Sequence, residues 1–152
     1  MPNTVDFRLL DDADRNTVVA IQGISFSGTT TRSLLSEPIF AFIDSTDPNI
    51  WLPASACRKF AEAFSLELES GSNRYIINST HREALRSAKP WVAFSLSNDL
   101  EGGNSVNIQL PYGAFDKELL YPLAANKTFY FPLRQAANDT QYTLGRTFLQ
   151  EA

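Results

Sequence analysis

The amino-acid sequence predicts a single β-rich domain with mostly antiparallel sheets, one medium helix and one or two short helices. Its 152 residues fit one domain and leave little room for two. Apolar residues make up 43% of the chain, which is enough to build a packed core. Glycine and proline recur at intervals that divide the chain into short segments, and this spacing is typical of a β-rich domain.

The predicted strands are short apolar segments that end at turn-forming residues. Residues 39–43 form a continuous apolar run, so we expect this strand to be buried on both faces. The run stops at Asp44, and the polar residues that follow are expected to project from the middle of the core. The other predicted strands cover residues 18–22 and 24–26, interrupted at Gly23, and then 75–77, 91–96, 106–110, 128–133 and 141–145.

Helical patterns occur at three places in the sequence. Pro53 suits a first helical turn, and the spacing of apolar residues after it predicts an amphipathic helix over 54–66. The apolar residues at helical spacing are Ala56, Phe60, Ala63 and Phe64. Thr80 and Glu83 form a capping-box pattern that predicts a short helix at about residues 80–87. A helical turn begins at residues 148–150 just where the chain stops, so we expect a domain that is truncated after 152.

The composition excludes several classes of function. A net charge of −4 argues against nucleic-acid binding, which needs a basic face. No apolar run approaches the roughly 18 residues of a membrane segment, and no signal-peptide pattern is visible at the start. Cys57 and His81 are the single cysteine and histidine, which excludes an internal disulfide and the usual His/Cys metal site. We therefore expect no metal and no cofactor, and what remains is either chemistry that carboxylates can perform or no chemistry at all.

Two separated motifs carry the functional signal. The first is an apolar pair followed by Asp44-Ser45-Thr46 and then by Trp51-Leu52-Pro53. The second spans residues 142–149, where apolar residues lead to Gly145. Together they resemble the active-site strand and loop, and the later glycine element, of a pepsin-type aspartic peptidase. The resemblance runs from about residue 17 to residue 152, covers the C-terminal lobe, and is nearest to divergent fungal members with Asp-Ser-Thr in place of Asp-Thr-Gly.

The resemblance implies that residues 1–152 form a single lobe of the bilobal pepsin-like acid protease fold. Asp44 then stands at a catalytic position, supported by Ser45, Thr46 and Gly145, and the glycine allows two backbones to approach closely. In the intact two-lobe protein an Asp dyad would hydrolyse bonds in a peptide or protein substrate. The second Asp would belong to an N-terminal lobe that is missing here, so we expect this chain alone to be inactive.

The surroundings of Asp44 depart from the family pattern. Thr46 replaces a glycine, and its β-branched side chain is expected to hinder N–H donation to the carboxylate. Asp47 replaces a hydroxyl residue, and its charge is expected to raise the pKa of Asp44. Besides an enzyme lobe, three alternatives stay open: a non-catalytic pseudo-peptidase that binds peptides or proteins, a homodimer pairing two Asp44 carboxylates, and an ordinary polar turn.

Other residues allow a functional and a structural interpretation. Trp51 and Tyr112 are candidates for a substrate cleft, although aromatic residues in a β-rich domain also form the core. The same two interpretations apply to Phe129, Tyr130 and Phe131. Cys57 is either one half of a disulfide whose partner lies beyond this chain or a buried core residue. His81 is expected on the surface at the start of a helix.

Three asparagines begin glycosylation sequons, namely Asn78, Asn126 and Asn138. Their number hints at a secretory origin, and the family resemblance implies a secreted or vacuolar location. The missing signal peptide conflicts with this location for the chain as it stands. An excised lobe or a fragment of a longer protein would reconcile the two observations.

Overall fold

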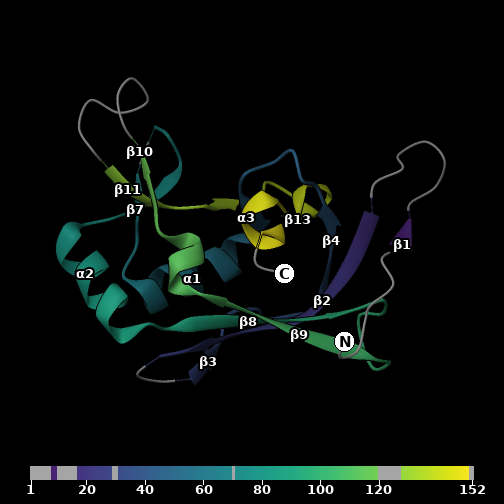
Figure 1. The fold of residues 1–152 in the computed structure, drawn as a ribbon. Helices are drawn as coiled ribbons and strands as arrows, with labels where there is room; N and C mark the ends of the chain where they lie inside the picture. The colour runs from purple at the N-terminus through teal and green to yellow at the C-terminus, as the bar shows by residue number, and fades with distance from the viewer. Residues whose placement is uncertain (1–7, 10–16, 29–30, 70, 120–127, 151–152) are drawn as a thin grey trace.

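The structure is a computed structural model that describes residues 8–9, 17–28, 31–69, 71–119 and 128–150. Strands of these residues form two sheets, and the fold is mainly β, as the sequence predicts (Figure 1). The larger sheet contains β1 (Arg8–Leu9), β2 (Thr17–Ser27), β3 (Thr31–Ser33), β4 (Ile39–Ile43), β5 (Ile50–Leu52), β8 (Trp91–Ser97), β9 (Ser105–Pro111), β12 (Leu133–Gln135) and β13 (Thr143–Leu144). The smaller sheet contains β6 (Glu67–Glu69), β7 (Arg74–Ile77), β10 (Lys117–Leu119) and β11 (Thr128–Phe131).

Most strand pairs in both sheets are antiparallel, which confirms the predicted sheet type. The pairs β13·β4 and β12·β5 are the parallel ones among the described residues. Helices connect and flank the sheets: α1 (Ala54–Phe64), α2 (Ser79–Ala88), α3 (Arg146–Leu149), and the 3₁₀ helices η1 (Tyr112–Phe115) and η2 (Asp139–Gln141). Within the described part of the chain, every helix is too short or too polar to span a membrane.

Helix α1 packs between the two sheets and supplies the centre of the core (Figure 1). Phe64 makes an edge-on contact with Phe26 of β2 at 5.1 Å between ring centroids. On its other side it contacts Phe131 of β11 at 4.9 Å. Ala56, Cys57, Phe60 and Phe64 are the buried residues of this helix, so the predicted amphipathic pattern is confirmed. One buried helix face thereby joins the two sheets into one hydrophobic core.

Two local predictions are wrong in detail. Strand β2 runs through Gly23 as one strand, because a register shift between Ile21 and Gly23 absorbs the irregularity without ending the pairing with β8. Helix α2 is capped by Asn78 and not by Thr80, since Asn78 Oδ1 accepts a hydrogen bond from the backbone N–H of His81 at 2.8 Å. Thr80 therefore lies inside the helix.

Strand β4 is buried on one face only, in contrast to the prediction. Ala41 is 1% exposed and faces the core, whereas Phe40 is 38% exposed. Ile39, Phe42 and Ile43 are half-buried. The described residues cover the core face of this strand and leave the opposite face partly open. Because β4 leads directly into Asp44, this partly open face adjoins the candidate site.

Candidate functional site

Strand β13 lies between β4 and β5 and brings the two sequence motifs together. It runs parallel to β4, with Thr143 opposite Phe42 and Leu144 opposite Ile43. It is antiparallel to β5, where Thr143 is paired with Trp51. The backbone N–H of Asp44 donates to the carbonyl oxygen of Leu144 at 3.2 Å. Asp44 is therefore fixed at the end of β4, beside the segment that carries Gly145.

Gly145 is the point of closest approach between the two motifs. A Cβ atom at this position would overlap the carbonyl oxygens of Asp47 and Asn49. The next residue, Arg146, donates its backbone N–H to the Asp47 carbonyl at 2.6 Å. Thr147 Oγ1 donates to the carbonyl of Pro48 at 2.8 Å. These contacts hold the loop that follows β4 against the start of α3.

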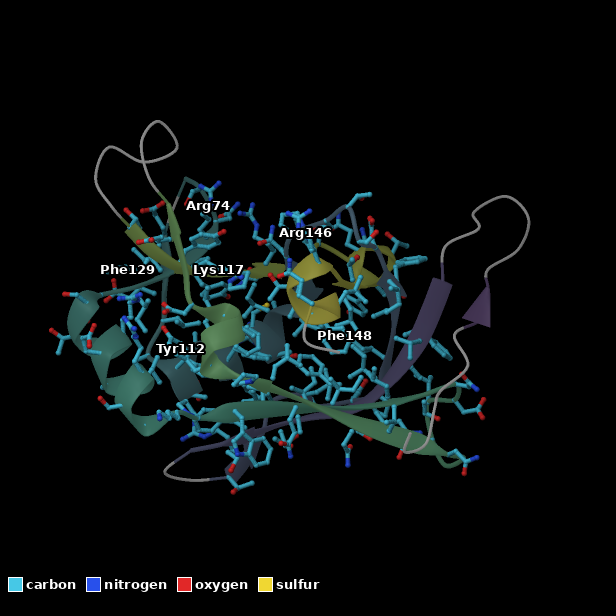
Figure 2. The ribbon with its side chains drawn as sticks, viewed as in Figure 1. Arg74, Tyr112, Lys117, Phe129, Arg146 and Phe148 are labelled. Carbon is cyan, nitrogen blue, oxygen red and sulfur yellow. The ribbon has the colours of Figure 1, made fainter. Side chains whose placement is uncertain are left out.

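Helix α3 in turn is anchored in the core. The ring of Phe148 meets that of Phe94 on β8 edge-on, with 5.2 Å between the centroids. Figure 2 labels Phe148 beside α3. Thr147 is also buried, and Arg146 is exposed. The loop around Asp44 is therefore connected through α3 to the central strands of the larger sheet, which gives the carboxylate a rigid support.

The carboxylate of Asp44 is held by Thr46. Its Oδ1 accepts the backbone N–H of Thr46 at 2.9 Å and the hydroxyl of Thr46 at 2.5 Å. These bonds favour the ionised form, with the hydroxyl bond as the larger cause, and lower the pKa of Asp44 below its ordinary value of 3.8.

Both expectations about the surroundings of Asp44 are corrected by this geometry. Thr46 keeps the N–H donation that its side chain was expected to hinder, and its hydroxyl adds a second donor. The pKa of Asp44 is lowered and not raised. The physical reason is the orientation of the Asp47 side chain. Its Oδ1 accepts the backbone N–H of Asn49 at 2.9 Å, so this carboxylate binds a backbone group of its own loop.

Replacement of Thr46 by valine should raise the pKa of Asp44 toward its ordinary value. Valine keeps the shape and the backbone N–H but removes the hydroxyl donor, which is the largest cause of the lowered pKa. Carboxyl NMR titration of Asp44 in both proteins measures the change. Serine at position 46 is the matched control, because it retains a hydroxyl and should retain a lowered pKa.

Wild type and Thr46→Val should also differ in their free energy of unfolding, and the difference should depend on pH. A lowered folded-state pKa stabilises the fold above the unfolded-state value, and this contribution is lost as the pH falls through the folded-state pKa. The stability difference between wild type and Thr46→Val is therefore expected at neutral pH and should vanish in strong acid. A difference that grows on acidification would contradict the role given to the hydroxyl.

Trp51 lines two hollows, and the smaller of them borders the loop that carries Asp44. One has a volume of about 200 Å³ and is lined by Asp47, Trp51, Gln141 and Thr143. The other has a volume of about 420 Å³ and is lined by Trp51, Leu68, Asn73, Arg134, Gln135, Ala136, Ala137 and Gln141. The indole Nε1 is buried and has no hydrogen-bond partner among the described residues. Trp51 therefore contributes its aromatic ring to both hollows, while its Nε1 is covered by neighbouring atoms.

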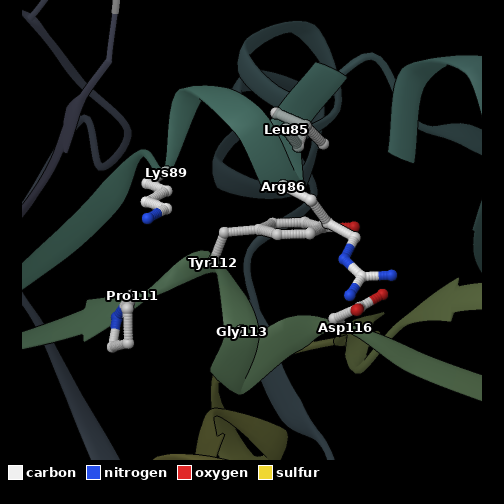
Figure 3. Close-up of a pocket in the computed structure, with 7 residues that line it drawn as sticks. All are labelled: Leu85, Arg86, Lys89, Pro111, Tyr112, Gly113 and Asp116. Atoms are coloured by element: carbon white, nitrogen blue, oxygen red, sulfur yellow. The ribbon is translucent and has the colours of Figure 1, made fainter. Parts of the chain in front are cut away.

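Tyr112 lies in a different pocket from Trp51. It is 4% exposed, and burial raises the pKa of its hydroxyl to about 12. Its ring lines a hollow with a volume of about 330 Å³. Figure 3 shows the lining residues, which are Leu85, Arg86, Lys89, Pro111, Tyr112, Gly113 and Asp116. None of these residues lines the two hollows beside Trp51. The structure therefore brings Trp51, but not Tyr112, to the loop that carries Asp44.

The remaining candidate residues are distributed over the lobe. Ser45, Asn78 and Asn138 are exposed, and Asn126 lies outside the described residues. His81 is exposed at the start of α2, which confirms its predicted position. Phe131 is buried, whereas Phe129 and Tyr130 are half-buried. Among the residues that the structure describes, no three histidine, cysteine, aspartate or glutamate side chains gather as metal ligands.

Cys57 is a wholly buried residue of α1. Its Sγ lies 3.6 Å from the carbonyl oxygen of Leu52 and 3.5 Å from that of Arg134. Burial raises the pKa of this thiol to about 12. This environment favours the interpretation of Cys57 as a core residue over that of a disulfide half.

We expect Cys57 to be unreactive in the folded protein. At mildly alkaline pH a thiol with a pKa of about 12 is almost entirely protonated, and its burial blocks access. A maleimide or an aromatic disulfide reagent should therefore label the protein only after denaturant is added. Rapid labelling of the native protein, at the rate seen in denaturant, would contradict this assignment.

Gln141 and Arg134 belong to the site although no sequence pattern points to them. Gln141 lines both hollows, and Arg134 places its guanidinium 5.5 Å from the centre of the Trp51 ring. Arg134 reaches Trp51 because β12 pairs with β5, with Arg134 directly opposite Trp51. This pairing joins segments far apart in the sequence, so only the three-dimensional structure reveals it.

The chain resembles a known protein in its fold but not in its sequence. No family model and no curated protein matches the sequence. Among solved structures, the crystal structure of the aspartic proteinase from Irpex lacteus matches with a TM-score of 0.55 at 12% sequence identity. The match covers 93% of this chain and 44% of that one, so this chain spans less than half of the length of its neighbour. The chain therefore has the fold of a single lobe of a pepsin-like aspartic proteinase.

Proposed function

We propose that this chain acts as one lobe of a pepsin-like aspartic endopeptidase and supplies one of its two catalytic carboxylates, that of Asp44. The observation that carries the proposal is the position of Asp44. It follows β4, is tied by its backbone to Leu144, and is held ionised by two donors of Thr46. The Irpex lacteus neighbour is named an aspartic proteinase, and this supports a polypeptide substrate for the present chain.

Hydrolysis by this chemistry needs two carboxylates that share one proton. Two close carboxylates cannot both ionise, so one remains charged and the other keeps its proton. The lowered pKa of Asp44 suits the charged role. Its carboxylate would take a proton from the attacking water while the protonated partner polarises the scissile carbonyl. The water oxygen bonds to the carbonyl carbon, and the C–N bond then breaks as the amine nitrogen gains a proton.

A second lobe is part of this proposal, because the described residues offer one suitable carboxylate. The partly open face of β4, with Phe40 38% exposed, supports a covering partner at this position. We propose that the partner is the N-terminal lobe of the same protein. A secreted or vacuolar location follows from the same comparison and is equally a proposal.

The hollows beside Trp51 are the proposed place of the substrate. The smaller hollow is lined by Asp47 and Thr143, in the loop and the strand that position Asp44, and it shares Trp51 and Gln141 with the larger one. An extended peptide presents side chains and backbone carbonyls in alternation. The exposed part of the Trp51 ring, which lines both hollows, would contact a side chain of the bound peptide.

Digestion assays with the chain alone and with the two-lobe protein test this proposal. The chain alone should not cleave denatured casein at acidic pH, and the two-lobe protein should cleave it. A transition-state-mimicking inhibitor of aspartic peptidases should block that cleavage. Cleavage by the chain alone, accompanied by a dimer in acidic gel filtration, would instead support a homodimer with two Asp44 carboxylates.

A non-catalytic peptide-binding module is the second candidate, and Thr46 is the observation that favours it. Both donors of Thr46 occupy Oδ1 of Asp44, whereas the family pattern has a glycine without a hydroxyl at this position. This candidate predicts that the two-lobe protein binds peptides and releases them intact. If Thr46→Gly then introduces cleavage, the scaffold is a decayed enzyme. If it does not, the binding function stands on its own.

A further inference from the structure

The loop between β12 and β13 contains a glycosylation sequon on the surface. Asn138, Asp139 and Thr140 are all exposed. An Asn-x-Thr sequence is an acceptor for N-linked oligosaccharide when it lies on a surface loop of a protein that enters the secretory pathway. Exposure of the whole tripeptide is the first requirement for a folded protein to carry such a glycan, and this sequon meets it.

Within the described part of the chain, the hydrogen bonds of the Asn138 side chain all involve its amide oxygen. Its Oδ1 accepts the backbone N–H of Thr140 at 3.0 Å and also the hydroxyl of Thr140. Among the described residues, Nδ2 has no hydrogen-bond partner. Because both bonds use Oδ1, a sugar attached to Nδ2 would leave them intact. Modification is therefore compatible with the local structure of η2, which Asn138 caps.

This loop lies at the rim of the hollows beside Trp51. Ala137 donates its backbone N–H to Oε1 of Gln141 at 2.7 Å, and Gln141 donates its own to the carbonyl of Asn138 at 3.1 Å. Thr143 Oγ1 donates to the carbonyl of Gln141 at 2.9 Å. Gln141 lines both hollows. The bonds on either side of Gln141 thus fix the position of Asn138 relative to the proposed substrate site.

We propose that Asn138 carries an N-linked glycan that stands at the rim of the candidate substrate cleft. The co-reactant is an oligosaccharide attached to a lipid pyrophosphate. Asn138 Nδ2 forms a bond to the anomeric carbon, the bond from that carbon to the phosphate oxygen breaks, and the lipid pyrophosphate leaves with the electron pair. The amide nitrogen gives up one proton to a base. The inference rests on the proposed function only through entry into the secretory pathway.

Expression behind a cleavable secretion leader in a eukaryotic host tests the proposal. Protein is collected from the medium and from the lumen of the endoplasmic reticulum. It is treated with an amidase that removes N-glycans and converts each acceptor asparagine to aspartate. Peptide mass spectrometry should then find aspartate at position 138. Without amidase treatment, the variant Thr140→Ala should migrate faster on a gel than wild type by the mass of one glycan, because it lacks this sequon.

Thr140→Ser is the matched control, because it keeps both the sequon and the hydroxyl. It should keep the mobility step and the aspartate at position 138. An unmodified Asn138 in lumenal protein, whether or not Asn78 or Asn126 is modified, would overturn the inference. The proposed function is tested separately by cleavage of casein, since neither the dyad nor peptide binding requires a glycan. A negative result in the glycan analysis therefore does not affect the interpretation of the casein assay, and the reverse also holds.

Discussion

Replacement of Gly145 by alanine should destabilise the lobe by about 3 kcal/mol, which is at the upper end for a single overpacking substitution. The added Cβ would overlap the carbonyl oxygens of both Asp47 and Asn49. These are backbone atoms on the loop behind β4, so no flexible side chain can move aside. The φ of Gly145 is −92°, which any residue adopts, and the requirement for glycine is therefore one of space.

Urea unfolding followed by tryptophan fluorescence measures this effect. Gly113→Ala is the matched control, because a Cβ at that position would meet nothing within 4 Å. The control should change the free energy of unfolding by less than about 1 kcal/mol. Near-equal free energies of unfolding for the two variants would show that the loop can shift to accept a Cβ at position 145. The close approach of the two motifs would then not be required for stability.

The meeting of Asp44 and Gly145 was expected because the two motifs resemble segments that cross in the pepsin-type fold. The first motif is an apolar strand that ends abruptly in a polar turn, and the second is the segment Tyr142-Thr143-Leu144-Gly145, which resembles the glycine element of that family. The core face of α1 was equally predictable from the spacing of Phe60 and Phe64. Such patterns are informative because burial on one face imposes a period on the sequence.

The short polar strands could not be predicted in the same way. Strands β3 and β6 are three residues long and exposed along their whole length, so burial imposes no pattern on them that a sequence could reveal. Their strand conformation depends on pairing with β2 and β7. The open face of β4 illustrates the reverse case: residues 39–43 are apolar throughout, yet the described residues cover only one side.

Side-chain orientation limits what the sequence reveals about the site. The sequence suggested that a threonine in place of a glycine hinders hydrogen bonding to the Asp44 carboxylate. In the structure, the hydroxyl of Thr46 points toward Asp44 and donates to it. A second carboxylate at position 47 suggested repulsion, whereas Asp47 turns toward the backbone of Asn49. Residue type gives the charge and the donors, but rotamers decide which partner each group meets.

Replacement of Asp44 by asparagine should reduce the kcat of the two-lobe protein by about 10³-fold, within the range that general base catalysis contributes. Asparagine has nearly the same shape, and its Oδ1 still accepts the two donors of Thr46. The fold should therefore persist, with a change in unfolding free energy of less than about 1 kcal/mol. The amide cannot take a proton from water, so the loss should appear in kcat more than in KM.

Asp47→Asn is the matched control for this experiment. It makes the same chemical change three residues along the loop, and its Oδ1 still accepts the N–H of Asn49. Because Asp47 lines the smaller hollow, a change is expected in KM, whereas kcat should stay within a few-fold of wild type. Equal losses in both variants would assign the effect to the charge of the loop and remove Asp44 from the dyad.

The pH dependence of cleavage links this test to the geometry of Thr46. The charged form of Asp44 is the base, so activity should decline on the acid side as the pH falls through its pKa. Because that pKa is lowered below 3.8, the wild type should remain active in stronger acid than Thr46→Val. The acid limb of the valine variant should thus move to higher pH while the alkaline limb, set by the protonated partner carboxylate, stays in place. Coincident acid limbs would mean that another group is the base.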